Sequence, residues 1–213
     1  MMLPKVEYLR GFALDYRLPN DVVKTLWENI SFARENPVSQ SEVLAGNISS
    51  SLKLEDTDNW FFDNVCIPKI IEFKEIFKSG GGHFNQAIFN NDVPYIMNSF
   101  WVNFQKQHEF NPLHNHTGLF SFVIFMKIPY DYREQRMIPH VKISNTPCAG
   151  DFVFVHVDLM GKICSYSYPL DPSCEGIMIL FPAEMNHQVY PFYNCEEERI
   201  TISGNIVYDR QRA

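Results

Sequence analysis

The first third of the chain has the apolar periodicity of two amphipathic helices. After Pro19, apolar residues recur every three or four positions, which is the helical period, and they are Val22, Val23, Leu26, Trp27, Ile30 and Ala33. Asn20 or Asp21 is a typical helix cap, and Pro37 is expected to end this helix. A second helix is predicted from about residue 58 to 77, kinked or split by Pro68 and ended by the glycines at 80–82.

The segments around these helices have weaker patterns. Residues 6–16 are expected to form a strand, although their apolar positions do not alternate cleanly. Residues 38–57 are polar and centre on Gly46-Asn47, so we interpret them as a loop. Residues 1–94 are therefore predicted to be a mainly helical support region.

The pattern changes after Pro94, where β-branched and aromatic residues gather in short runs separated by Gly and Pro. This spacing leaves no room for a long helix and is typical of an antiparallel sandwich or jelly roll. We predict one mainly β (α+β) domain over residues 1–213, with its core in 95–208 and the amphipathic helices packed on one sheet. The predicted strands are 96–105, 120–128, 151–157, 163–168, 176–181, 187–192 and 199–208.

Composition and charge narrow the classes of function. The 213 residues include 18 Lys+Arg and 25 Asp+Glu, a net charge of −7, which argues against nucleic acid as a partner because phosphate binding needs a basic face. No apolar run has the length of a membrane span and the first residues lack a secretory core, so we expect a cytoplasmic protein without a membrane partner. The five cysteines form no C-x-x-C pair and are expected to be reduced thiols. The sequence carries no signal for an oligomeric state.

The densest group of metal-binding side chains lies between residues 110 and 118. His114 and His116 are two residues apart, so on a strand both imidazoles point to one face and can bind one metal ion. An open metal site needs a third ligand, and the best candidate is His187, which begins a strand after a Pro turn. An H-x-H pair alone is a weak signal, because histidine pairs also arise by chance.

The last predicted strand alternates between polar and apolar residues. Arg199 lies twelve residues after His187, and a guanidinium there can bind a carboxylate ligand through two hydrogen bonds. The polar face points either to solvent or into a barrel lumen, and the strand alone favours solvent because half-buried strands are common. That polar face carries Arg199, Thr201, Ser203 and Asn205, and the opposite face carries Ile200, Ile202 and Ile206.

Taken in order, these segments resemble the iron(II)/2-oxoglutarate-dependent oxygenase superfamily. They are most similar to its uncharacterised members, often encoded by phages, that place a Trp-x-Asn strand before an H-x-H. The likeness covers most of the chain, with its specific motifs between residues 101 and 205. The matching segments are Trp101-Val102-Asn103, Asn111-Pro112-x-His114-x-His116-x-Gly118, the run from Gly176 through Pro182 to His187, and Arg199-Ile200-Thr201-Ile202-Ser203-Gly204-Asn205.

This resemblance implies a double-stranded β-helix, which is a jelly-roll fold, with iron(II), 2-oxoglutarate and O2 as its reagents. The implied reaction hydroxylates a substrate C–H bond and converts 2-oxoglutarate to succinate and carbon dioxide, with no catalytic residue beyond the metal ligands. The substrate is a small molecule or a peptidyl side chain, and a phage-encoded enzyme would act in the host cytoplasm. The resemblance implies His114, His116 and His187 as metal ligands, Arg199 for the distal carboxylate of 2-oxoglutarate with Thr201 or Ser203 as helpers, and Asn103 and Ser121 as further inner-face contacts.

The second metal ligand departs from the usual pattern of this superfamily, which is H-x-D or H-x-E. His116 stands at that position, and three neutral imidazoles leave the metal one charge more positive, so zinc or another divalent ion is an alternative occupant. A competing H-x-D exists at His156 and Asp158. It lies only 31 residues before His187, against 73 for His114, which leaves little room for the strands between them, so we favour the earlier pair.

Two other functions fit parts of the sequence. A cupin-type metalloenzyme that does not use 2-oxoglutarate is suggested by Gly176-x5-Pro182-x4-His187, although Glu184 and Pro191 depart from that motif. A non-catalytic jelly-roll binding or virion protein with structural histidines is the second alternative, because a fold alone does not fix function. Metal binding and the response to 2-oxoglutarate distinguish the three.

Overall fold

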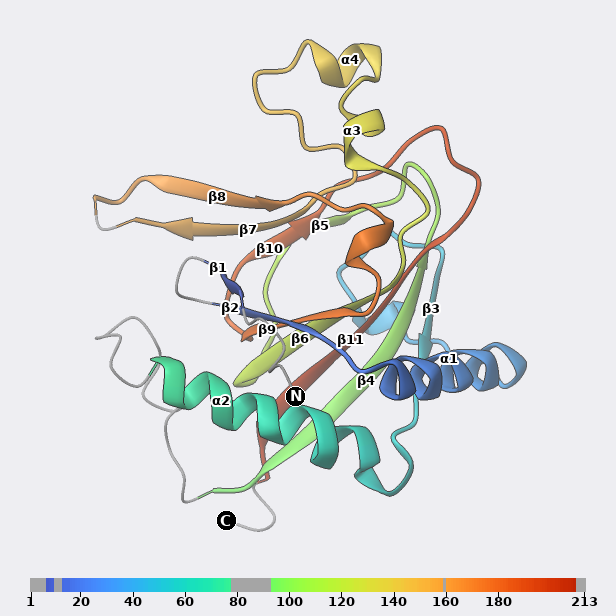
Figure 1. Ribbon diagram of the computed structural model, residues 1–213, viewed down its shortest axis with the longest axis vertical. Coiled ribbons are helices and arrows are strands. Elements are labelled where there is room, and N and C mark those ends of the chain that lie inside the picture. Colours follow the sequence, from blue (N-terminus) through green and yellow to red (C-terminus); the bar gives the residue numbers. More distant parts are fainter. Residues whose placement is uncertain (1–6, 10–12, 78–92, 159, 210–213) are drawn as a thin grey trace.

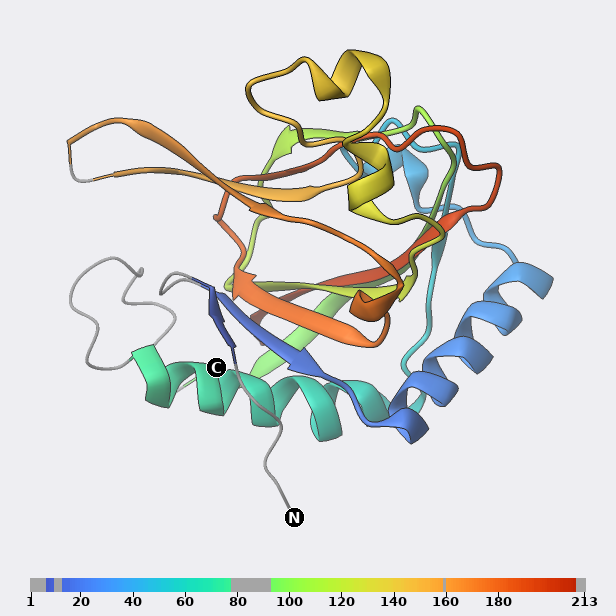
Figure 2. The ribbon, with the colours of Figure 1, turned by 45° about the horizontal axis from the view of Figure 1, so that its top comes forward.

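Two antiparallel sheets face each other in the computed structural model of the protein (Figures 1 and 2). The structure describes residues 7–9, 13–77, 93–158 and 160–209. Together the sheets form the expected jelly roll, open at its edges rather than closed into a barrel. The larger sheet has the order β1 (Glu7–Leu9), β2 (Ala13–Arg17), β9 (Ile177–Pro182), β6 (Phe120–Lys127), β11 (Arg199–Tyr208), β4 (Tyr95–Gln105) and β3 (Ser50–Lys53). The smaller sheet has the order β5 (Asn111–His114), β10 (His187–Val189), β7 (Phe152–Val157) and β8 (Ile163–Tyr168).

Strand β6 separates the two hydrophobic cores of the protein. Successive side chains of a strand point to opposite faces, and here both faces are buried. Phe122 and Ile124 belong to the core beneath the helices, whereas Val123 and Phe125 belong to the core between the sheets. Each such side chain contributes about 1.5–3 kcal/mol by its burial. The pattern of β6 therefore fixes which face of the larger sheet is available for a site.

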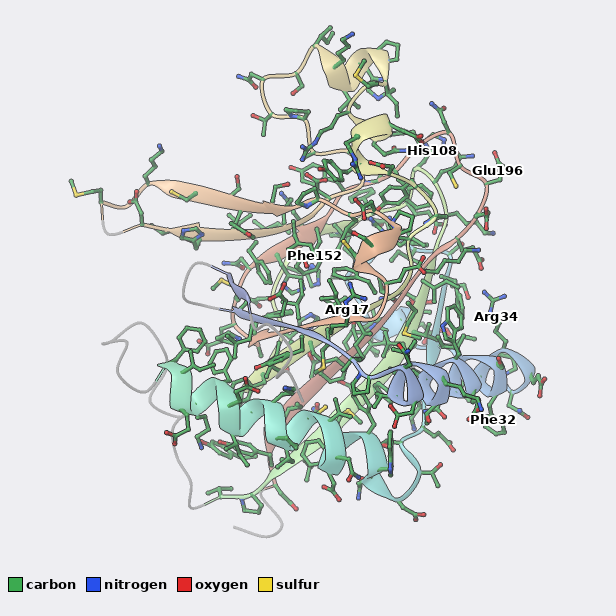
Figure 3. The ribbon with its side chains drawn as sticks, in the orientation of Figure 1. Arg17, Phe32, Arg34, His108, Phe152 and Glu196 are labelled. Atoms are coloured by element: carbon green, nitrogen blue, oxygen red, sulfur yellow. The ribbon has the colours of Figure 1, made fainter. Side chains whose placement is uncertain are left out.

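The two long helices cover the outer face of the larger sheet (Figure 2). Helix α1 (Asn20–Glu35) buries Leu26 and Ile30, and helix α2 (Ile67–Phe77) buries Ile70 and Phe73. On α1, Phe32 and Arg34 lie on the far side of the sheet from Phe152, which lies between the two sheets (Figure 3). The helices thus support the sheet from behind and leave its inner face for the site.

The second helical stretch has the predicted extent and is distorted just before Pro68. Helical residues continue from Trp60 through the π-helical turn Phe62–Cys66 into α2, which starts at Ile67, so Pro68 lies inside the stretch and directly after its irregular turn. The carboxylate of Asp56 accepts hydrogen bonds from the backbone N–H groups of Phe61 and Phe62, both 2.8 Å long. The predicted stop at the glycines 80–82 lies outside the described residues.

Four strands differ from the sequence-based prediction, namely β1, β2, β3 and β5. Residues 38–57 are not only a loop, because Ser50–Lys53 forms β3 and pairs with β4; its serines hide it from a hydrophobic pattern. Strand β5 is missing from the predicted strands, and it holds His114 but ends before His116, so the two histidines do not share one strand face as expected. The predicted strand over 6–16 is two strands, β1 and β2. The expected helical support region therefore also supplies three strands of the larger sheet.

An insertion between β6 and β7 carries the short helices α3 (Tyr132–Gln135) and α4 (Pro139–Lys142), at the top of Figure 1. Arg133 is paired with Asp131 at 2.9 Å and with Asp171 at 3.0 Å. Gln135 donates to the carbonyl of Tyr193 and accepts from its N–H, each at 2.9 Å. Arg133 thus joins the insertion to the segment between β8 and β9, and Gln135 joins it to the segment that follows β10. Among the described residues, no helix is long and apolar enough to cross a membrane.

Candidate active site

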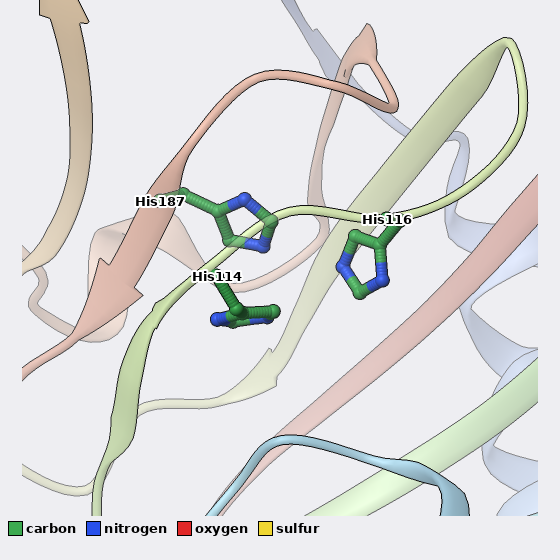
Figure 4. A group of neighbouring side chains, drawn as sticks. All are labelled: His114, His116 and His187. Atoms are coloured by element: carbon green, nitrogen blue, oxygen red, sulfur yellow. The ribbon is translucent and has the colours of Figure 1, made fainter.

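Three histidines meet at one end of the smaller sheet (Figure 4). His114 ends β5 and His187 begins β10, and the two are direct partners in the antiparallel register. His116 lies in the turn after β5, where its N–H donates to the carbonyl of Ala183 at 2.9 Å. One ligand nitrogen from each imidazole lies within 4.8 Å of the other two. The structure thus brings together residues that are up to 73 positions apart in the sequence.

Backbone carbonyls orient two of the three imidazoles. The Nδ1 of His114 lies 2.7 Å from the carbonyl oxygen of Pro112, and the Nδ1 of His187 lies 2.9 Å from that of Met185. A carbonyl only accepts, so each Nδ1 must carry the proton, and each Nε2 keeps its lone pair for a ligand. Such an outer hydrogen bond is the usual companion of a metal-binding histidine.

Burial keeps the three imidazoles neutral at pH 7. It lowers the pKa of His187 to about 3 and that of His116 to about 4, with the neighbouring His114 as a further cause in both. Burial also lowers the pKa of His114, against the opposing effect of its hydrogen bond to Pro112. Neutral imidazole is the form that binds metal ions, so the protein does not have to lose protons here before a metal binds.

The donor set fits a divalent transition metal. Three neutral imidazole nitrogens suit iron, zinc, copper or nickel, and leave coordination positions for small ligands. The competing pair does not join the cluster: His156 is on β7, and the Asp158 carboxylate accepts from the N–H groups of Met160 and Lys162 in the following turn. Within the described part of the chain, the cluster contains no carboxylate.

The inner face of the larger sheet forms the opposite wall of a pocket. Arg199, Thr201 and Ser203 of β11 line this pocket together with the three histidines. The solvent interpretation of the alternating strand is therefore wrong, since its polar face points between the sheets. In the register of β4 and β11, Gln105 is opposite Arg199, Asn103 is opposite Thr201, and Trp101 is opposite Ser203; all six line the pocket.

The guanidinium of Arg199 is 1% exposed and donates all five of its N–H groups to the protein. Its Nε and Nη2 both donate to Oε1 of Gln105, at 3.2 and 2.6 Å. Nη1 donates to the Tyr130 hydroxyl and, at 2.9 Å, to the carbonyl of Gly150, and Nη2 also donates to the carbonyl of Tyr190 at 3.1 Å. Every acceptor is neutral, because burial raises the pKa of Tyr130 to about 12.

The remaining predicted residues divide between the pocket and the sheet. Asn103 lines the pocket, and its Oδ1 accepts from the Ser51 hydroxyl at 2.7 Å. Ser121 is outside the pocket lining and donates to Oδ1 of Asn205 at 2.7 Å. Sequence reasoning missed Ser51 and Gln105, because only the strand register places them beside Asn103 and Arg199.

Residues 44–48 form a strap along the side of the pocket. Asn47 exchanges hydrogen bonds with Phe110, 2.8 and 3.4 Å long, which attaches the strap to the segment before β5. Gly46 of the strap lies so close to Asn111 that a Cβ on Gly46 would be 2.1 Å from Oδ1 of Asn111. That Oδ1 is buried without a hydrogen-bond donor among the described residues. A side chain at position 46 would therefore require the amide of Asn111 to turn away.

Comparison with known families identifies the chain. Residues 99–205 match the family described as "Putative 2OG-Fe(II) oxygenase", and this range holds all three histidines and Arg199. The protein belongs to this family of 2-oxoglutarate/iron(II) oxygenases. Among curated proteins, none matches the sequence.

Solved structures of similar fold include two prolyl hydroxylases. One is a prolyl-4-hydroxylase from Pseudomonas putida, with 13% identity, a TM-score of 0.49 and 90% of each chain covered. The other is a viral collagen prolyl hydroxylase from Paramecium bursaria Chlorella virus 1, solved with 2-oxoglutarate. It has 11% identity and a TM-score of 0.48, with 92% of this chain and 95% of that chain covered.

Proposed function

We propose that the protein is an iron(II)- and 2-oxoglutarate-dependent oxygenase that hydroxylates its substrate. The observation that carries the proposal is the pairing of a neutral three-histidine cluster with a buried cation across one pocket. A metal on His114, His116 and His187 and a carboxylate near Arg199 would be the two ends of one bound cosubstrate. Membership of the oxygenase family supports the same assignment.

The two walls of the pocket would have different roles, metal binding on the histidine side and carboxylate binding on the β11 side. His114, His116 and His187 would hold Fe(II), with the carbonyls of Pro112 and Met185 fixing two of the rings. When bound, Fe(II) with 2-oxoglutarate and O2 supplies the oxidation: one oxygen atom enters the substrate C–H bond as a hydroxyl, the other enters succinate, and carbon dioxide leaves.

Arg199 would bind the distal carboxylate of 2-oxoglutarate by exchange with Gln105. Gln105 is the pocket-lining member of the acceptors around Arg199, whereas Tyr130, Gly150 and Tyr190 lie outside the lining. A carboxylate is a stronger acceptor for a guanidinium than an amide oxygen. Thr201, two residues along β11 on the same face, has a hydroxyl without a hydrogen bond to any described residue and would complete this subsite.

Apolar side chains would keep water away from the reacting centre. The pocket lining includes Phe125, Phe152, Leu170 and Phe181, and the rings of Phe152 and Phe181 lie 5.5 and 5.0 Å from that of His187. Exclusion of water strengthens the electrostatic contacts inside a site and limits side reactions of a reactive centre.

An anaerobic titration tests the proposal. Metal-free protein receives Fe(II) and then 2-oxoglutarate, while the visible absorption spectrum is recorded. Chelation of 2-oxoglutarate to bound iron gives a weak charge-transfer band, which should be absent in His187→Ala and need more 2-oxoglutarate in Thr201→Val. Bound iron without the band favours the cupin-type metalloenzyme, and failure to bind iron overturns the proposal.

A further inference from the structure

The polar face shared by β4 and β11 is a ladder of three residue pairs that differ in their hydrogen bonding. At one end, Arg199 donates to Oε1 of Gln105. At the other end, Ser203 is opposite Trp101, four residues and roughly 13 Å along the strand from Arg199. Trp101 lies beside the metal cluster, since its ring centroid is 6.0 Å from that of His116. The second end of the ladder is therefore a separate position in the same pocket.

This second end presents hydrogen-bond donors that have no acceptor in the described protein. Trp101 is 3% exposed, lines the pocket and has an indole N–H that makes no hydrogen bond to a described residue. An indole only donates. The hydroxyl of Ser203 is likewise without an acceptor among the described residues, and so is the Nδ2 of Asn103 in the neighbouring middle pair, whose Oδ1 accepts from Ser51. Because these side chains line the pocket, their donors are available to a ligand that enters it.

The charge of the pocket has one sign. None of the described residues that line it is Asp or Glu, although the chain as a whole has a net charge of −7. The buried carboxylates among the described residues are Asp15, Asp151 and Asp209, all outside the lining. Asp151 accepts from Ser167, is paired with Arg136 at 3.2 Å and also interacts electrostatically with Arg199, so these two arginines and one carboxylate together bring one positive charge.

A charge count then gives the sign of the missing ligand. A divalent metal and Arg199 bring three positive charges, the three imidazoles bring none, and dianionic 2-oxoglutarate removes two. One positive charge remains, which in an H-x-D or H-x-E site would be cancelled by the protein itself. An uncompensated charge in a low-dielectric pocket is costly and attracts a counterion. A phosphate monoester, at about −1.5 to −2, would overcompensate it.

We infer that the substrate is an organic acid, whose single carboxylate binds at the Trp101–Ser203 end of the pocket, next to the metal. This inference rests on the proposed function and names the substrate class of that site. The indole N–H of Trp101, the hydroxyl of Ser203 and the amide of Asn103 donate to the carboxylate, while the carboxylate of 2-oxoglutarate occupies the Arg199 end. Because His116 is neutral where a carboxylate ligand is usual, one positive charge remains, and the carboxylate of the substrate neutralises it.

The test compares two probes of the same shape and different charge, acetate and acetamide. Protein loaded anaerobically with Fe(II) and saturating 2-oxoglutarate is titrated with each probe, and the paramagnetic relaxation of the probe's methyl protons is measured by NMR. Acetate should show saturable relaxation and acetamide should not. Trp101→Phe and Ser203→Ala should each weaken acetate binding about tenfold, as expected for loss of a hydrogen bond to a charged group. His116→Asp, which restores the usual ligand charge, should weaken it at least as much.

The visible band of iron-bound 2-oxoglutarate is recorded in the same samples. If the band never forms, the proposed function itself fails. If the band forms but acetate and acetamide relax alike, the organic-acid inference is overturned and the oxygenase proposal stands. If acetate binds only while it removes the band, it competes with 2-oxoglutarate at Arg199, and the second carboxylate position is overturned. If Trp101→Phe and Ser203→Ala both bind acetate as tightly as the wild-type protein does, that position is also overturned.

Discussion

Gln105 holds the edge of Arg199 that faces the pocket. Its single Oε1 accepts from both Nε and Nη2 of the guanidinium, at 3.2 and 2.6 Å, while its Nε2 donates to the carbonyl of Glu109. A carboxylate that binds arginine side-on uses the same two donors. Gln105 thus occupies the place where an incoming carboxylate would bind. Without a ligand, it satisfies the two guanidinium donors that face the pocket.

Replacing this internal competitor should tighten cosubstrate binding. In Gln105→Leu the Nε–Nη2 edge of Arg199 loses its acceptor, so 2-oxoglutarate no longer has to displace one, and its Kd should fall about tenfold. Isothermal titration of 2-oxoglutarate into the Mn(II)-loaded protein measures this change. Gln107→Leu is the matched control, because Gln107 is bonded to the exposed Glu196 instead. A Kd that rises or stays constant in Gln105→Leu would show that Gln105 only supports the fold.

Metal binding should depend on the three clustered histidines and not on the competing pair. His114→Ala and His187→Ala should lose stoichiometric Fe(II) or Mn(II), whereas His156→Ala, a change on β7 outside the cluster, should keep it. Elemental analysis after gel filtration gives the stoichiometry. A metal that binds the folded state alone raises stability by about 2.7 kcal/mol at a hundred times its Kd, so thermal denaturation gives a second measure. Equal loss in His156→Ala would contradict the assignment.

The metal-free protein should lose stability in mild acid. The folded-state pKa of His187, lowered by burial to about 3, lies below its unfolded value near 6.5. Between these values the unfolded chain binds a proton that the folded chain excludes, so stability rises with pH in this window and falls as pH drops from about 6.5 toward 4. The slope is at most about 1.4 kcal/mol per pH unit for this one group.

Urea denaturation of the metal-free protein at pH 7 and pH 5 measures this dependence. His187→Gln removes the titrating group and should show a smaller fall, which separates its contribution from that of the carboxylates. An unchanged pH dependence in His187→Gln would mean that His187 takes up a proton equally in both states.

The close approach of Gly46 to Asn111 should make these positions energetically coupled. A Cβ at position 46 would lie 2.1 Å from Oδ1 of Asn111, so Gly46→Ala should cost about 0.5–1.5 kcal/mol of stability, which is the cost of forcing a side chain out of its rotamer. Asn111→Ala removes the opposing atom, so the double variant should recover most of that loss. A denaturant double-mutant cycle measures the coupling. Additive losses would contradict the steric explanation.

The sequence predicts the chemistry of this site better than its geometry. The H-x-H pair, His187 and the alternating strand from Arg199 are local patterns, and they identify the residues that meet in the pocket. The direction of that strand's polar face could not be read locally, since solvent and pocket produce the same alternation. Only the position of β11 inside the larger sheet, between β6 and β4, settles it.

Residues that act through strand register escape the sequence altogether. Gln105 has no signal of its own until the pairing of β4 with β11 places it opposite Arg199. Ser51 was assigned to a loop because β3 is short and polar, yet it donates to Asn103 inside the pocket. Strand pairing is set by the packing of the whole sheet, and a period-two pattern carries no information about the partner strand.

The two walls of the pocket belong to different sheets. His114 and His187 are on the four-stranded sheet, whereas Arg199 and Thr201 are on the seven-stranded sheet. A molecule that chelates the metal at one end and binds β11 at the other therefore links the two sheets through non-covalent contacts. Its arrival should slow amide hydrogen exchange in β5 and β10 and in β11 together. Hydrogen-exchange protection of both sheets would then show, without any turnover, whether metal and 2-oxoglutarate are bound.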